Sequence, residues 1–91
     1  MQTNTFHITP FFIEVDGVQV EILEVLKSQL ISGDTWYHVV VSINYNGIKS
    51  RRYSLDVKDI KDLTNKLKIE ITKIKFIDYA YGIDEVKRLI T

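Results

Sequence analysis

The residues of this chain that could do chemistry are concentrated in the stretch WYHVVVSINYNGIKSRRYSL, residues 36–55. Its aromatic side chains could stack on nucleic-acid bases, and its cations could contact phosphates, as in proteins that bind single strands on an open sheet. If these residues alternate along two paired strands, one face of the sheet collects both kinds of side chain. This candidate face for nucleic acid or a protein partner consists of Trp36, His38, Val40, Lys49, Arg51 and Tyr53.

The same face could instead be buried. Trp36, Val40, Tyr53 and Leu55 would form an apolar cluster too large to leave exposed on a monomer. A second copy of the chain could cover it, giving a dimer or larger homo-oligomer, or the aromatic C-terminal segment around residues 76–81 could fold over it. The zero net charge disfavours nucleic acid. We therefore expect a non-catalytic interaction module that self-associates through its sheet, with binding of single-stranded DNA or RNA as the alternative.

The sequence gives little indication of metal binding, catalysis or phosphate binding by a glycine-rich loop. His7 and His38 have no metal-ligand spacing between them, and the chain has no cysteine. Glu14 and Glu21 could approach each other across a hairpin, but outward acids on a strand pair are usually solvated. No serine stands in a nucleophile elbow, and four scattered glycines build no phosphate loop. We expect no catalytic, cofactor-binding or metal-binding residues, no cofactor, and no enzymatic activity.

Length and composition indicate one small domain. The 91 residues suffice for a single core, which we assign to residues 11–91, with a flexible N-terminus over residues 1–10. Without a signal-peptide pattern or a membrane-length apolar run, we expect a soluble, cytoplasmic protein with no membrane partner. Thirteen isoleucines and nine lysines are typical of AT-rich genomes and many thermophiles. Residues 1–47 hold one cation against five anions, and residues 48–91 hold eleven cations against seven anions.

Two hairpins are expected to position the candidate face. Asp16-Gly17 and Asn46-Gly47 each separate alternating apolar runs, which is the signal for a two-residue turn. We expect strands over 11–15, 18–31, 36–45 and 48–55, the second of them curved or bulged. The turn at 46–47 would set Tyr45 opposite Ile48, Val41 opposite Arg52 and Val40 opposite Tyr53. A turn one residue longer would exchange the two faces.

Helical patterns follow the second hairpin. Residues 55–68 predict an amphipathic helix capped by Asp56, with Leu55 and Ile60 as a hydrophobic staple. This helix is expected to cover the sheet face of Val39, Val41 and Ile43. Residues 69–78 favour a fifth strand, with one continuous long helix as the alternative. Residues 83–90 predict a short C-terminal helix. The expected fold class is α+β: a four- or five-stranded, mainly antiparallel sheet built from hairpins, with one amphipathic helix on one face.

Overall fold

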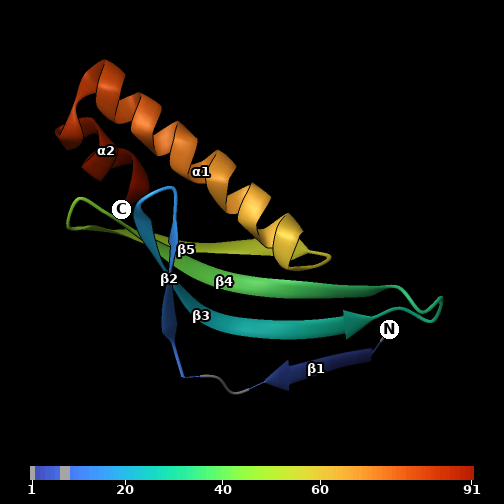
Figure 1. The fold of residues 1–91 in the computed structure, drawn as a ribbon. Helices are drawn as coiled ribbons and strands as arrows, with labels where there is room; N and C mark the ends of the chain where they lie inside the picture. Colours follow the sequence, from blue (N-terminus) through green and yellow to red (C-terminus); the bar gives the residue numbers. More distant parts are fainter. Residues whose placement is uncertain (1, 7–8) are drawn as a thin grey trace.

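The computed structural model describes the backbone of residues 2–6 and 9–91 and the side chains of residues 9–91, and it has an α+β fold (Figure 1). The described residues form a five-stranded antiparallel sheet followed by two helices. The sheet order is β1-β3-β4-β5, with β2 also pairing with β3. The elements are β1 (Gln2–Phe6), β2 (Phe11–Val15), β3 (Val18–Gln29), β4 (Thr35–Tyr45), β5 (Ile48–Val57), α1 (Ile60–Tyr81) and α2 (Ile83–Ile90).

The N-terminal segment contributes the fifth strand. Residues 2–6 pair with residues 25–29 of β3, while β2 pairs with residues 18–22 of the same strand. The two short strands therefore divide one edge of β3 between them. Residues 2–6 belong to the segment that we expected to be a flexible N-terminus, and they form a strand because the long β3 offers backbone hydrogen-bonding groups beyond the reach of β2. His7 lies outside the described residues.

Both predicted hairpin turns are confirmed. Asp16 and Gly17 have φ angles of 51° and 78°, and Asn46 and Gly47 have φ angles of 48° and 81°. Positive φ at both central residues is the geometry that joins two twisted strands through a two-residue turn. The predicted irregularity of β3 is also present, because its pairing with β4 shifts register between Ile22 and Glu24.

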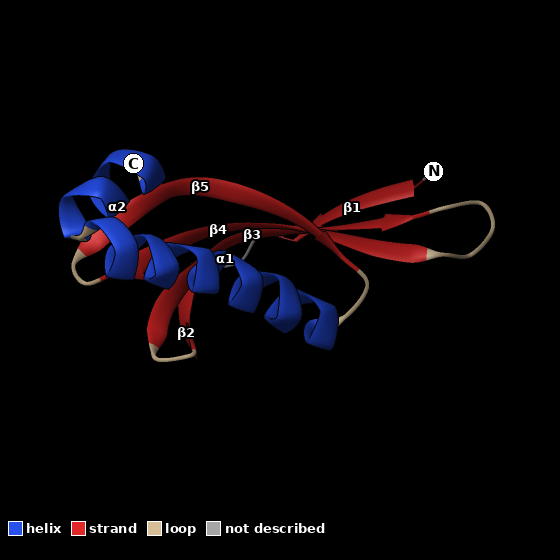
Figure 2. Cartoon of the chain, turned by 90° about the horizontal axis from the view of Figure 1, so that it is seen from above, coloured by secondary structure: helices blue, strands red, loops and turns tan. Residues whose placement is uncertain are grey.

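Both helices lie on one side of the sheet (Figures 1 and 2). The core between the two layers contains Val20, Val41 and Ile43 from the sheet, which are fully buried. Leu67 and Ile71 from α1 and Val86 from α2 complete its centre. The predicted packing of a helix on the Val39, Val41 and Ile43 face is confirmed. Neither α1 nor α2 combines the length and the apolar character that a membrane-spanning helix requires.

Helix α1 differs from its prediction at both ends. It begins after Asp59, whose carboxylate accepts a hydrogen bond from the Asp62 backbone N–H at 2.8 Å. Asp56 is therefore not the cap, since β5 runs to Val57 and includes it.

The favoured strand over residues 69–78 is wrong, because α1 continues through this segment to Tyr81. Ile69 and Phe76 suggested a strand because they fall outside the helical apolar arc, and in α1 they are 55% and 66% exposed. Ile71 and Ile74 lie on the opposite, buried side of the helix and hold it against the sheet. The sheet still has five strands, but β1 takes the place of the predicted strand.

Helix α2 has the predicted charge order, with Asp84 and Glu85 in its first turn and Lys87 and Arg88 in its last. It is separated from α1 by Gly82, which has a φ angle of 93°. A left-handed φ of this kind is readily adopted only by glycine, so the residue ends one helix and redirects the chain into the next.

Candidate functional site

The β4–β5 hairpin decides which candidate residues share a face. Its pairing begins as predicted, with Tyr45 opposite Ile48. The register then shifts, and Val41 lies opposite Tyr53 rather than opposite the predicted Arg52. A β-bulge that places two residues of β5 opposite one of β4 accounts for the shift. Beyond the bulge, every β5 side chain therefore lies on the face opposite to the predicted one.

Two buried serines stabilise the bulge. The Ile43 backbone N–H donates to the Ser50 hydroxyl at 2.8 Å, and this hydroxyl donates to the Arg51 carbonyl at 2.7 Å. The Ser42 hydroxyl donates to the Ser50 carbonyl at 2.9 Å. These bonds replace ladder hydrogen bonds that the extra residue interrupts. Sequence reasoning missed Ser50, although a small hydroxyl residue within a strand near a turn is compatible with a bulge.

The six predicted candidate residues are divided between the two sides of the sheet. Four of them, Trp36, His38, Val40 and Lys49, lie on the side away from the helices. Arg51 and Tyr53 lie on the helix side, where the Arg51 guanidinium donates to the Leu89 carbonyl at 2.8 Å. The guanidinium carbon also lies 5.2 Å from the centre of the Tyr53 ring. The prediction that all six share one face is wrong because of the bulge.

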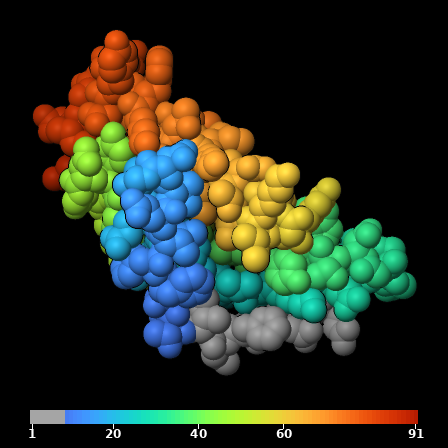
Figure 3. Space-filling model, viewed as in Figure 1, coloured from blue at the N-terminus to red at the C-terminus, as the bar shows by residue number. Residues whose placement is uncertain are grey.

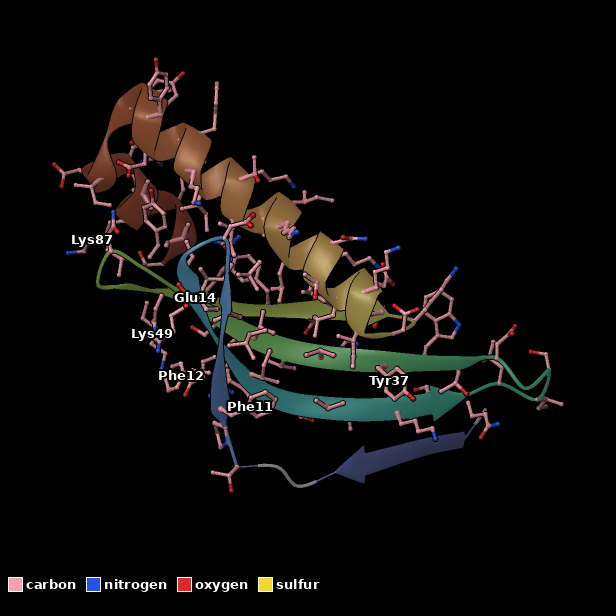
Figure 4. The ribbon with its side chains drawn as sticks, in the orientation of Figure 1. Phe11, Phe12, Glu14, Tyr37, Lys49 and Lys87 are labelled. Atoms are coloured by element: carbon pink, nitrogen blue, oxygen red, sulfur yellow. The ribbon has the colours of Figure 1, made fainter. Side chains whose placement is uncertain are left out.

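The side away from the helices forms a continuous surface of cross-strand rows, which we call the open sheet face. Cross-strand partners project from the same side of a sheet, so the registers define its members. They are Phe12, Glu14, Gln19, Glu21, Glu24, Leu26, Ser28, Trp36, His38, Val40, Ser42, Asn44, Lys49, Arg52, Ser54 and Asp56. Figure 4 labels Phe12, Glu14 and Lys49, which lie toward the end of the sheet that holds the two tight turns.

Two of the carboxylates of the open sheet face are paired within the chain. Lys49 lies 3.5 Å from the Glu21 carboxylate. His38 Nδ1 lies 2.5 Å from Asp56 Oδ1. Four carboxylates stand against two cations, Lys49 and Arg52, among the members of this face. The face is consequently not a basic surface.

An apolar cluster occupies the other end of the open sheet face. Leu26 lies opposite His38, and Trp36 and Val40 flank His38 along β4. All four side chains are half-buried by their neighbours. The Lys58 ammonium group lies 5.3 Å from the centre of the Trp36 ring. This arrangement gives the cluster an apolar surface with a cation at its border.

The C-terminal segment does not cover this cluster. That alternative is wrong, because residues 76–81 belong to α1 on the other side of the sheet. Phe76, Tyr79 and Tyr81 are exposed, Tyr79 to 89%.

A groove on the helix side was not foreseen in the sequence. Near its first turns, α1 leaves part of the sheet uncovered, and the opening has a volume of about 700 Å³. In Figure 3, β2 in blue and the first turns of α1 in yellow lie on either side of it. Its apolar lining comes from β2, β3, β4, β5 and α1. It includes Phe11, Ile13, Val25, Tyr37, Val57 and Leu63. Figure 4 labels Phe11 and Tyr37.

Apart from the Tyr37 hydroxyl, the polar side chains of this groove, which we call the α1 groove, lie at its α1 end. They are Lys58, Asp59, Lys61 and Thr64. The Thr64 hydroxyl donates to the Ile60 carbonyl at 3.0 Å, and the Asp59 carboxylate caps the helix. The Lys58 ammonium group lies at the Trp36 ring on the open sheet face, which leaves Lys61 as the cation of the groove. No local sequence signal predicts such a groove, because it depends on the angle at which α1 crosses the sheet.

Neither surface holds a recognisable metal site. Among the described residues, no group of three or more histidine, aspartate or glutamate side chains could hold a metal ion. The fold and these two surfaces define an α+β domain with one uncovered sheet face and one apolar groove. Comparisons with known proteins return no match to a family model, a curated protein or a solved structure.

Proposed function

We propose that this protein is a small, non-catalytic intracellular interaction module that self-associates through its open sheet face. The observation that carries the proposal is the apolar cluster of Leu26, Trp36 and Val40 on a face that neither helix covers. An apolar sheet surface is stabilised when a second layer packs on it, at a spacing of about 10 Å between sheets. A second copy of the chain supplies such a layer, and tryptophan is enriched at protein interfaces. The absence of cysteine fits a reducing compartment.

The paired charges support the same proposal. Burying an unpaired charge at an interface is strongly unfavourable, whereas a charge that already has a partner loses less on desolvation. His38 with Asp56, and Lys49 with Glu21, are paired within one chain. A two-fold arrangement of two such faces therefore needs no new ion pairs for these four side chains.

Association through the free edge of β5 is less favourable. This edge carries the bulge at residues 50–51, and it is rich in charged residues, including Lys49, Arg51, Arg52 and Asp56. Bulges and charged side chains are the features by which sheet edges resist pairing with another strand. The face, rather than the edge, is therefore the contact that we propose.

The geometry favours self-association over binding of single-stranded nucleic acid. Arg51 and Tyr53, which the nucleic-acid hypothesis needs beside Trp36 and Lys49, lie on the helix side. The remaining face has more carboxylates than cations. Phosphate binding requires the opposite balance.

Sedimentation equilibrium of a Val40→Lys variant tests the proposal. Val40 lies opposite Glu24, so the new ammonium group has a carboxylate beside it and the monomer should remain folded. We expect wild-type protein to have dimer or larger mass, and the variant to have monomer mass. The matched control is Ile69→Lys, at an apolar position on the outer side of α1 that is 55% exposed, and it should keep the wild-type mass.

Two outcomes would count against the proposal. Wild-type protein of monomer mass up to high micromolar concentration would exclude self-association. A wild-type oligomer that survives Val40→Lys but is dissociated by Ile69→Lys would move the contact from the sheet to α1. Titration with a single-stranded oligonucleotide at low salt should leave Trp36 fluorescence unchanged. A saturating, salt-reversible quench would instead support the nucleic-acid alternative.

A further inference from the structure

We propose that the α1 groove is a second binding site, for a ligand that has a long apolar chain and one carboxylate, such as a fatty acid. The groove is on the helix side of the sheet, whereas the proposed self-association uses the open sheet face. The two proposals rest on different residues.

The size and lining of the groove fit the apolar part of such a ligand. Its volume of about 700 Å³ falls within the range of about 300–1,000 Å³ that is typical of small-molecule pockets. At the sheet, Val25, Tyr37 and Val57 present apolar surface to it. Phe11 and Ile60, which also line the groove, remain 47% and 82% exposed. An apolar chain in the groove would remove this surface from water.

The charge at one end of the groove determines which head group the ligand should carry. Asp59 and Asp62 are both committed to the start of α1, since Asp59 accepts from the Asp62 N–H at 2.8 Å and Asp62 accepts from the Lys58 N–H at 3.0 Å. The Lys58 ammonium group lies against the Trp36 ring. Lys61 makes no ion pair with any residue in the range 9–91. A carboxylate is therefore the complementary group at this end, with Lys61 as its first partner.

The same lining disfavours a peptide as the occupant. A peptide brings backbone N–H and C=O groups along its whole length, and each one that is buried without a partner is unfavourable by about 1–3 kcal/mol. Apart from the Tyr37 hydroxyl, the polar side chains of the groove belong to residues 58–64. A ligand whose single polar group is at one end matches this distribution.

Isothermal titration with decanoate, dodecanoate and dodecanol, each below its aggregation limit, tests the site. Burial of one methylene increases affinity roughly fourfold. Dodecanoate has two more methylenes than decanoate, so we expect it to bind about 15-fold more tightly. Dodecanoate should also bind more tightly than dodecanol. Lys61→Gln should weaken dodecanoate binding about three- to tenfold and leave dodecanol binding unchanged.

Matched variants distinguish binding in the groove from the loss of a lysine elsewhere on α1. Lys68→Gln removes an exposed lysine of the same helix that does not line the groove, and it should bind dodecanoate like wild type. Val25→Phe fills part of the groove and should reduce binding at least tenfold. Far-UV circular dichroism verifies that this variant is folded. If the variant is not folded, the test is instead whether dodecanoate changes the NMR shifts of the Val25 and Leu63 methyl groups in the wild-type protein.

Three results would overturn the proposal. Equal binding to wild type and folded Val25→Phe, or unchanged methyl shifts, would exclude the groove. Equal affinity for dodecanoate and dodecanol, unaffected by Lys61→Gln, would exclude the carboxylate. A wild-type dimer that dodecanoate dissociates would assign the groove to a second copy instead. The monomeric Val40→Lys variant should bind dodecanoate normally, so the failure of one proposal is distinguishable from the failure of the other.

Discussion

The Ser50 hydroxyl accepts a hydrogen bond from the Ile43 backbone N–H at 2.8 Å, and it thereby holds the bulge that divides the β4–β5 hairpin into two registers. Without this bond, a buried backbone donor would have no partner. The position of Tyr53 on the helix side depends on the register that this bulge sets.

Replacement of Ser50 by alanine should therefore destabilise the protein by about 1–3 kcal/mol, the typical result of leaving a buried backbone donor unsatisfied. Ser54→Ala is the matched control, since Ser54 is an exposed serine of the same strand, and it should change stability by less than about 0.5 kcal/mol. Urea unfolding followed by circular dichroism measures both. Equal effects of the two substitutions would mean that the serine hydroxyl does not stabilise the bulge.

A second prediction concerns the bond between Tyr45 and Asp78, whose oxygens lie 2.7 Å apart. Donation of the Tyr45 hydroxyl to Asp78, together with burial and the nearby negative charge, raises the pKa of Tyr45 from 10.0 to about 12. The folded protein therefore holds this proton more tightly than the unfolded chain. The contribution to stability should be complete below about pH 10 and should be lost as the pH rises through about 12.

Tyr45→Phe tests this dependence. It should lower the free energy of unfolding by about 1–2 kcal/mol at neutral pH. The difference from wild type should shrink above about pH 10, because wild type then loses the bond as well. Tyr79→Phe is the control at a side chain that is 89% exposed, and it should change little at any pH. A difference between wild type and Tyr45→Phe that stays constant up to about pH 12 would contradict the assigned pKa.

A third prediction distinguishes a helix from a strand over residues 69–78. In a strand, Ile69 and Ile71 would lie on the same face, whereas in α1 they point to opposite sides, with exposed fractions of 55% and 0%. Ile71→Ala should destabilise the protein by about 2–5 kcal/mol, and Ile69→Ala by less than about 0.5 kcal/mol. Thermal or urea unfolding of both variants provides the comparison. Similar losses at the two positions would favour a strand.

Local signals predicted the turns because a two-residue hairpin needs only its own two residues to adopt positive φ. Asp16-Gly17 and Asn46-Gly47 do so in the structure. The amphipathic start of α1 was also predictable, because Leu63 and Leu67 recur at helical spacing. Its continuation was not, since the exposed Ile69 and Phe76 weaken the same periodicity. Packing of Ile71 and Ile74 against the sheet outweighs that local pattern.

The candidate face was half predictable. Trp36, His38 and Val40 alternate within one regular strand, so their common side follows from the period of a strand. Arg51 and Tyr53 lie beyond the bulge, and one extra residue there reverses the side to which they point. The sequence does not show which strand residue is left unpaired, because that depends on the partner strand.

The sequence by itself determined the α+β class, the two tight turns, the irregular β3 and the charge order of α2, because each of these depends on residues that are neighbours in the chain. Only the tertiary structure decided the pairing of residues 2–6, the length of α1, the division of the candidate face and the existence of the α1 groove. These features depend on contacts between residues far apart in sequence. Such contacts are decided by how well distant surfaces pack and pair, which no local pattern records.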